Sequence, residues 1–134
     1  MSQIKVVQSV SASPAQVWAV VGNPFSLDKW HPAIVALEGD NDTARSCTLP
    51  DGAVIHEKIR ARDDAGMRYE YTITESPLPV KNYRSILSVE AAPEGAVITW
   101  EGSFEALAAE QEMEATVRGV YEAGLTAVKA SFES

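Results

Sequence analysis

Glu57 is a carboxylate placed within an apolar pattern. The stretch 54–61 alternates, and one side of it carries Ile55, Glu57, Ile59 and Ala61. Alternate side chains of a strand point to the same face of a sheet, so the pattern places this carboxylate on a buried face. Burying a carboxylate without a partner is costly. We therefore expect Glu57 to be paired, hydrated or protonated.

The neighbouring hairpins supply partners for Glu57. Turn-forming residues at 50–52 and 63–66 fold one strand back on each side of it. The residues that these turns bring opposite Glu57 are Arg45 or Cys47 on one side and Tyr71 or Ile73 on the other. We therefore expect a polar cluster inside an apolar shell.

Two interpretations fit a cluster of Glu57, Arg45, Tyr71 and Tyr69, and the sequence leaves both open. A buried ion pair can simply fix the register of the strands. Alternatively, a carboxylate in an apolar pocket has a raised pKa and acts as a general base, while a tyrosine hydroxyl stabilises an enolate oxygen. Glu57 and Tyr71 would then be the catalytic pair. No second carboxylate or histidine joins them on the inward face, so binding without catalysis needs fewer assumptions.

The remaining reactive side chains favour structural roles. Cys47 has no neighbouring base, and we expect it to act as a small buried hydrophobe. His31 lies beside Trp30 at a helix end before Pro32, where it could bind a ligand, although capping or packing is the favoured role. His31, His56 and Cys47 lack the spacing of metal ligands, so we expect no metal site and no cofactor.

Periodicity predicts the elements that position these residues. A strand over 4–10 precedes a short helix that opens with the capping box Ser13-Pro14-Ala15-Gln16, and a second short helix follows near 26–30. A 3.6-residue period predicts a long helix over 109–133. The stretches between them that alternate like strands are 34–39, 44–49, 54–63, 67–75, 82–91 and 96–105.

This order, β-α-α-β6-α, predicts an α+β fold in which a curved antiparallel sheet wraps around the last helix. Small residues flank the apolar stripe of that helix. They are Gly119, Ala123, Gly124, Ala127 and Ala130. They either let the helix approach the sheet closely or leave an internal cavity, which is where ligand sites usually form.

Length and charge narrow the classes of partner. The 134 residues fit one domain, 1–134. Nineteen acidic residues against eleven basic ones give a net charge of −8, which disfavours nucleic acids and anionic membranes. No apolar run approaches the roughly 18 residues of a membrane span. A lone cysteine without a signal peptide fits the cytoplasm. We expect a monomer or weak homodimer.

The motifs resemble the SRPBCC superfamily, the polyketide cyclase/dehydrase and START-like proteins with the helix-grip fold. The resemblance covers essentially the whole chain and is with small bacterial members. The segments that carry it are Ser13-Pro14-Ala15-Gln16-Val17-Trp18, Trp30-His31-Pro32, Leu49-Pro50-Asp51-Gly52, Glu57-Lys58-Ile59, Asp63-Asp64, Tyr69-Glu70-Tyr71-Thr72-Ile73, Pro77-Leu78-Pro79-Val80, Asn82-Tyr83 and Val97-Ile98-Thr99-Trp100. Because this superfamily hosts many functions, the resemblance implies the fold more firmly than an activity.

A more distant resemblance is to the plant abscisic-acid receptors. Their gate loop carries a Leu-Pro that matches Leu49-Pro50, and their cavity glutamate matches Glu57. Their latch has His-Arg-Leu where this chain has Leu78-Pro79-Val80, so hormone-dependent phosphatase inhibition is not implied. The resemblance implies a cavity lidded by two loops, 49–53 and 76–81.

We therefore expect an internal cavity that binds a small hydrophobic or amphipathic molecule of lipid, polyketide or phenolic type. Glu57 and Arg45 would orient its polar end, and Arg45 would suit an anionic head group. The alternatives are a cyclase or dehydratase, and a protein-interaction module whose two loops expose an apolar patch including Leu78 and Val80. The residues expected to line the cavity are Trp30, Arg45, Cys47, Glu57, Tyr69, Tyr71, Tyr83, Trp100, Val117, Tyr121 and Leu125, with Leu49, Pro50, Leu78 and Pro79 in the gate loops.

Overall fold

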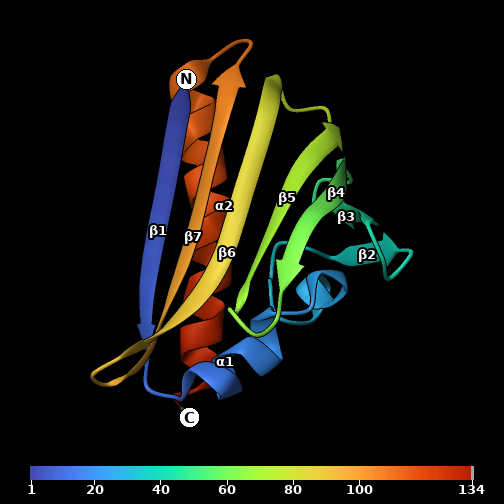
Figure 1. The fold of residues 1–134 in the computed structure, drawn as a ribbon. Coiled ribbons are helices and arrows are strands. Elements are labelled where there is room, and N and C mark those ends of the chain that lie inside the picture. Colours follow the sequence, from blue (N-terminus) through green and yellow to red (C-terminus); the bar gives the residue numbers. More distant parts are fainter. Residues whose placement is uncertain (134) are drawn as a thin grey trace.

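A seven-stranded antiparallel sheet and one long helix dominate the computed structural model, which describes residues 1–133 (Figure 1). The strands follow the order β1-β7-β6-β5-β4-β3-β2 across the sheet, so β2 to β7 form the predicted meander and β1 pairs with the last strand. The helix-grip α+β fold is confirmed. The elements are β1 (Ser2–Val10), α1 (Pro14–Val21), the 3-10 helix η1 (Pro24–Lys29), β2 (Ala36–Gly39), β3 (Ala44–Thr48), β4 (Val54–Asp63), β5 (Arg68–Glu75), β6 (Val80–Ala92), β7 (Gly95–Ala106) and α2 (Glu110–Ser131).

Local sequence signals set the beginning of both short helices. The Gln16 amide donates to Ser13 Oγ at 3.1 Å, and the Ser13 amide donates to Gln16 Oε1 at 3.0 Å, which completes the predicted capping box. The side chain of Asn23 accepts a hydrogen bond from the Phe25 amide and caps η1. This second helix therefore begins at Pro24, two residues before the predicted position, because the cap was not recognised in the sequence.

The predicted inward and outward side chains of β4 agree with the structure except at the C-terminal end of the strand. Ile55, Glu57 and Ile59 are buried, whereas Ala61, expected to point inward, is exposed. A register shift between Ile59 and Ala61 explains the difference, since one extra residue in a bulge moves the following side chain to the other face.

The long helix α2 packs mainly against β1 and β7 at one side of the sheet (Figure 1). Its buried residues are Val117, Tyr121, Gly124, Leu125 and Val128. By contrast, α2 makes few close contacts with β2 to β5, and the helix η1 packs against β2. This arrangement leaves room between the middle of the sheet and α2. Neither α2 nor another helix in residues 1–133 is long and apolar enough to cross a membrane.

The two glycines of α2 have opposite environments, which leads to a paired prediction. A Cβ on Gly124 would lie 2.5 Å from His31 Cδ2 and 3.1 Å from Trp100 Cζ3, whereas a Cβ on Gly119 would meet nothing within 4 Å. Gly124→Ala is expected to lower the free energy of unfolding by about 1–3 kcal/mol through overpacking. Gly119→Ala should raise it by about 0.5–1 kcal/mol through helix propensity. Urea denaturation measures both, and equal effects would contradict this account of the helix contact.

Candidate ligand-binding cavity

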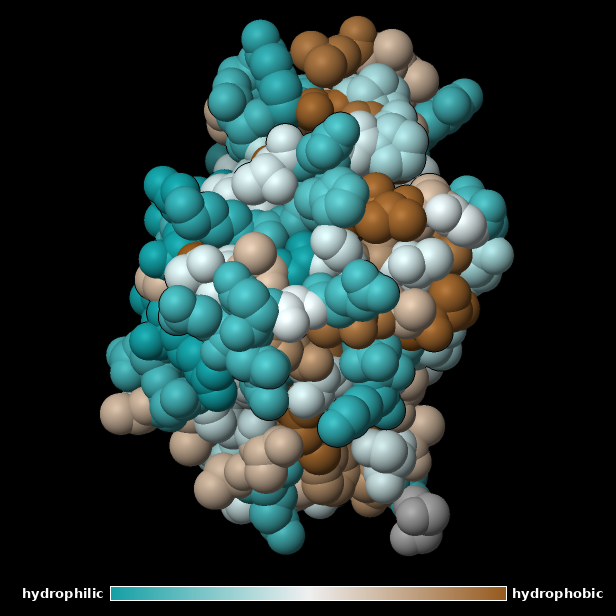
Figure 2. All heavy atoms as spheres, turned by 90° about the vertical axis from the view of Figure 1, so that its right-hand side faces the viewer, coloured by the Kyte–Doolittle hydropathy of each residue, from teal (hydrophilic) through white to brown (hydrophobic). Residues whose placement is uncertain are grey.

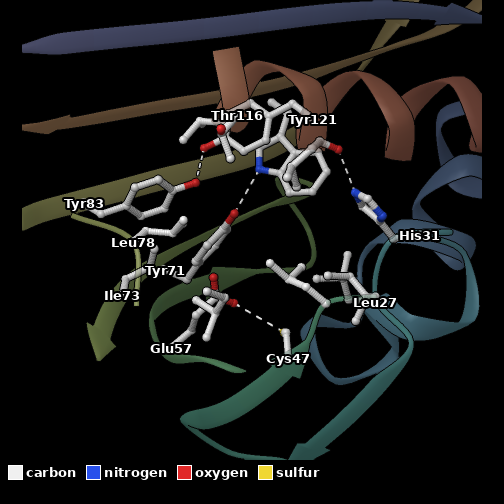
Figure 3. Close-up of a pocket in the computed structure, with 16 residues that line it drawn as sticks. Leu27, His31, Cys47, Glu57, Tyr71, Ile73, Leu78, Tyr83, Thr116 and Tyr121 are labelled. Atoms are coloured by element: carbon white, nitrogen blue, oxygen red, sulfur yellow. Dashed lines mark hydrogen bonds between the residues drawn. The ribbon is translucent and has the colours of Figure 1, made fainter. Parts of the chain in front are cut away.

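A cavity of about 70 Å³ lies between the concave face of the sheet and α2 (Figure 3). Apolar side chains from the sheet, from η1 and from α2 form most of its wall. The polar side chains of the wall come from β4, β5 and β6, from α2 and from the segment after η1. The lining residues are Leu27, His31, Ile34, Cys47, Leu49, Ile55, Glu57, Tyr71, Ile73, Leu78, Tyr83, Trp100, Thr116, Val117, Val120 and Tyr121.

The structure brings part of the expected set to this cavity. Among the expected residues, those in the wall are Cys47, Glu57, Tyr71, Tyr83, Trp100, Val117 and Tyr121, together with Leu49 and Leu78 of the loops. The expected residues that lie outside the wall are Trp30, Arg45, Tyr69, Leu125, Pro50 and Pro79.

The residues outside the wall have other neighbours. Arg45 and Tyr69 contact each other behind Glu57, and Trp30 packs against Trp100 and His31. Leu125 is buried one turn beyond Tyr121 on α2. The periodicity correctly indicated that Arg45, Tyr69 and Leu125 face the core. A side chain can face the core without bordering the cavity.

Several lining residues were missed by sequence reasoning. Leu27 and Ile34 come from η1 and the segment after it, where no strand period indicates a face. Thr116 and Val120 flank the buried stripe of α2. The apolar character of Leu27 within the Pro24–Lys29 helix was the available signal, but it does not show which part of the core that helix covers.

Glu57 forms a buried ion pair with Arg45. Arg45 lies directly opposite Glu57 in the β3–β4 ladder, and Arg45 Nε donates to Glu57 Oε1 at 2.7 Å. On the other side of β4, Ile73 lies opposite Glu57. Of the alternatives that the sequence left open, the partners of Glu57 are therefore Arg45 rather than Cys47 and Ile73 rather than Tyr71. Arg45 Nη1 donates to the Pro24 carbonyl at 2.6 Å and to Tyr69 at 3.4 Å.

The aromatic rings complete the surroundings of Arg45. Its guanidinium carbon lies 4.6 Å from the Tyr71 ring centre and 5.6 Å from that of Tyr69, within cation–π range. Burial lowers the pKa of Arg45, but the charge of Glu57, together with smaller contributions from Tyr69, Cys47 and Tyr71, more than offsets burial and holds the pKa well above its ordinary value. The guanidinium therefore stays charged.

Cys47 is a donor in this cluster. Its Sγ lies 3.6 Å from Glu57 Oε1, and burial, together with the charge of Glu57, raises the pKa of the thiol to about 12. A nucleophilic cysteine needs a lowered pKa. Cys47 therefore remains a protonated thiol that hydrogen-bonds to Glu57.

A hydrogen-bonded network of hydroxyl groups lies on the other side of the cavity. Tyr83 and Tyr121 share a short hydrogen bond, and Ser85 Oγ lies 2.9 Å from the Tyr121 hydroxyl. Trp100 Nε1 donates to Ser85 Oγ at 3.0 Å and to the Tyr71 hydroxyl at 3.2 Å. Burial raises the pKa of Tyr71 and Tyr83 well above the ordinary value and that of Tyr121 to about 12, so these hydroxyls stay protonated.

Both nitrogens of His31 are occupied by the protein. Nε2 lies 2.7 Å from the carbonyl oxygen of Val120, which can only accept, so Nε2 carries the hydrogen. Nδ1 accepts from the Ala33 amide at 3.1 Å. The ring also packs edge-on against Trp100. His31 thus fastens η1 to α2, and it has no free nitrogen for a ligand.

This arrangement predicts a pH dependence of stability. Burial lowers the pKa of His31 from 6.5, so the unfolded chain takes up a proton there before the folded protein does. Stability is therefore retained above this pH and lost as the pH falls below it, by at most about 1.4 kcal/mol between about pH 7.5 and pH 5.5. Urea denaturation at both pH values should show a smaller loss in His31→Gln, and an unchanged loss would contradict this role.

Three other depressions found on residues 1–133 are more open to solvent than this cavity. Within residues 1–133, no group of three or more His, Cys, Asp or Glu side chains is arranged to hold a metal ion. A larger depression of about 560 Å³ lies at Lys5, Arg84, Glu101 and Arg118, but it is open and charged. The cavity beneath α2 is therefore the better place to shelter an apolar molecule.

The apolar patch expected on the loops is not formed. Leu78 is half-buried against the cavity, and Val80 is half-buried against the core. The large exposed hydrophobic residues within residues 1–133 come from separate segments of the chain; they are Met1, Val7, Val35, Val54 and Leu107. Viewed from the side of β2 to β4, the surface is largely hydrophilic with hydrophobic residues in scattered groups (Figure 2).

Comparisons with solved structures and protein families agree with this architecture. The chain is similar to the protein XoxI from Bacillus cereus, with 29% identity, coverage of 98% of this chain and 96% of that one, and a TM-score of 0.94. An uncharacterised protein from Bacillus thuringiensis has 28% identity, coverage of 99% and 100%, and a TM-score of 0.93.

A START superfamily protein from Mycobacterium smegmatis shares the fold at 10% identity, with 98% and 97% coverage and a TM-score of 0.77. No curated protein matches the chain. The family model described as "Polyketide cyclase / dehydrase and lipid transport" matches residues 1–133. This chain belongs to that family of polyketide cyclases, dehydrases and lipid-transport proteins.

Proposed function

We propose that the protein binds a small, largely apolar molecule in the cavity between the sheet and α2. The observation that carries the proposal is an apolar enclosure with a few polar groups, among them Glu57, Tyr71 and Tyr83, on one part of its wall. Sites for small molecules typically combine such walls with a few polar groups that orient the ligand. The family description, which includes lipid transport, supports the same reading.

The size of the cavity indicates that binding widens it. Its volume of about 70 Å³ is small beside the ~150 Å³ of an engineered cavity that admits benzene, and smaller still than the roughly 300–1,000 Å³ of drug-sized sites. Leu49 and Leu78 are half-buried wall residues carried by the connections between β3 and β4 and between β5 and β6. These two loops are the part of the wall that we propose moves apart to admit the ligand.

Binding without turnover is the activity that the polar groups favour. Glu57 Oε1 already accepts from Arg45 and Cys47, so this carboxylate oxygen is engaged in a buried ion pair. The tyrosine hydroxyls have raised pKa values and remain protonated. A cyclase or dehydratase reaction would need a free base among these groups, which is why we place binding first.

A ligand screen tests this proposal. Native mass spectrometry of the purified protein should detect a retained small molecule, or a thermal-shift screen of fatty acids, flavonoids and polyketides should raise the melting temperature. A ligand present at a hundred times its Kd stabilises the folded state by about 2.7 kcal/mol. If the protein purifies without a ligand and no compound class changes its melting temperature, the proposed function is wrong.

A further inference from the structure

The two carboxylate oxygens of Glu57 have different surroundings. Arg45 Nε donates to Oε1 at 2.7 Å, and the Cys47 thiol lies 3.6 Å from the same oxygen. Oε2 accepts no hydrogen bond from any residue within 1–133, and Figure 3 shows it turned away from Cys47. The protein therefore fixes the carboxylate through one oxygen and leaves the lone pairs of the other unused.

Oε2 is also accessible, although Glu57 is buried. Within residues 1–133, the fully buried side-chain nitrogens and oxygens that lack a hydrogen-bond partner are Trp30 Nε1 and Arg45 Nη2. Oε2 lacks a partner too but is not one of these enclosed atoms, so it still borders open space. Because Glu57 lines the cavity, a ligand there can reach this oxygen.

The tyrosine hydroxyls of the wall lie apart from Oε2. Tyr71, Tyr83 and Tyr121 belong to one cluster, in which Tyr83 bonds to Tyr121 and Tyr71 accepts from Trp100 Nε1. Figure 3 shows the Tyr71 hydroxyl directed toward Tyr121 and α2, away from the Glu57 carboxylate. This cluster links the sheet to α2, and recognition of a ligand beside Glu57 rests on Oε2 itself.

The charge around Oε2 restricts the ligand further. The cavity wall contains no lysine or arginine, and Arg45 lies behind Glu57 with its side chain fully buried. A ligand carboxylate would therefore face the charge of Glu57 without a cation in the wall. An ammonium group would bring an uncompensated charge into an apolar site, because Arg45 already neutralises Glu57. A neutral polar group is the one that this site accommodates.

Building on the proposed function, we infer that Glu57 determines ligand specificity, its Oε2 accepting one hydrogen bond from a neutral O–H or N–H group of the ligand. A ligand without such a donor would displace water from Oε2 and leave a charged acceptor unsatisfied. A site built around one polar atom rejects analogues that cannot pair with it. The anionic head group expected from the sequence is thus replaced by a neutral donor.

Three probes of similar size test the need for a donor. Benzyl alcohol, benzaldehyde and benzoate carry a donor, an acceptor alone and a negative charge on the same phenyl ring. Nitrogen-15 chemical-shift titrations of the wild-type protein, followed at cavity residues, give the three Kd values. Benzyl alcohol should bind at least about tenfold more tightly than either of the others, because hydrogen bonds to charged groups are the stronger ones.

Glu57→Gln changes the atom that faces the ligand from an acceptor to a donor. The amide oxygen takes the place of Oε1, because Arg45 and Cys47 are donors, and the amide nitrogen takes the place of Oε2. Benzaldehyde can then accept from this nitrogen. We expect the affinities of benzyl alcohol and benzaldehyde to lie within about twofold of each other, or to reverse in order.

Two further variants guard against a folding defect. Glu57→Gln leaves Arg45 without a counter-charge, whereas the double variant Arg45→Met with Glu57→Met removes both charges together with Oε2. This double variant should also bind the alcohol and the aldehyde within about twofold of each other. Tyr69→Phe, whose hydroxyl contacts Arg45 outside the cavity wall, is the matched control and should keep the wild-type preference.

The outcomes separate this inference from the proposed function. If benzaldehyde or benzoate binds the wild-type protein at least as tightly as benzyl alcohol, or if a folded Glu57 variant keeps the wild-type preference, the inference about Glu57 is overturned while binding in the cavity stands. If none of the three probes shifts the signals of cavity residues, both proposals fall.

Discussion

Replacing Arg45 with methionine is expected to lower the free energy of unfolding by about 3–5 kcal/mol. The Arg45 side chain is 0% exposed, and its only carboxylate partner within residues 1–133 is the buried Glu57 at 2.7 Å. Methionine fills similar space but leaves the carboxylate without its counter-charge in an apolar interior. The change in stability can be measured by urea denaturation followed by circular dichroism.

An exposed ion pair in the same sheet provides the control for this prediction. Arg84 lies 2.8 Å from Glu70, but its side chain is 60% exposed, so Arg84→Met should cost less than about 1 kcal/mol. Adding Glu57→Met to Arg45→Met removes the stranded charge and should recover most of the loss. The account of Glu57 would be wrong if Arg45→Met cost no more than Arg84→Met.

Filling the cavity should abolish ligand binding. Val120 lines the cavity with its side chain, while only its backbone carbonyl holds His31. In Val120→Phe, a phenyl ring replaces an isopropyl group and occupies space that a ligand would need. We expect the affinity for a small aromatic probe such as benzyl alcohol to fall by more than about a hundredfold, whereas overpacking should cost about 1–3 kcal/mol of stability. Isothermal titration calorimetry and thermal melting measure the two effects separately.

The same substitution on the outer face controls for added hydrophobicity. Val7 of β1 is 53% exposed, and Val7→Phe should leave both the affinity and the melting temperature close to wild type. A folded Val120→Phe variant that binds benzyl alcohol as well as Val7→Phe does would place the ligand elsewhere on the protein.

Alternation and turn residues made much of the fold predictable. The meander of β2 to β7 follows from apolar residues at every second position and from the turn residues between the strands. The same pattern narrowed the β3 partner of Glu57 to Arg45 or Cys47, and the structure shows that it is Arg45. Ala61 was misplaced because a bulge changes the phase of a strand without a clear compositional sign. Local sequence patterns therefore predict which side chains of a strand point inward, until a bulge interrupts the regular pairing with the neighbouring strand.

The wall of the cavity was less predictable for a physical reason. Periodicity distinguishes an inward from an outward side chain, but Arg45, Tyr69 and Leu125 point inward without reaching the cavity. Which inward residues border empty space depends on how far α2 lies from each strand, and that distance is a tertiary property. The hydrogen bonds that join Tyr83 to Tyr121 and Tyr71 to Trp100 likewise depend on tertiary contacts between separate elements.

The most direct test of ligand binding in the cavity is an isotope-filtered nuclear Overhauser measurement with benzyl alcohol bound to methyl-labelled protein. We predict contacts from the benzyl protons to the methyl groups of Ile55, Val117 and Val120, which line the cavity. Contacts confined to the open depression near Ile86 and Arg84, or the absence of any saturable contact to the cavity methyl groups, would contradict the central claim.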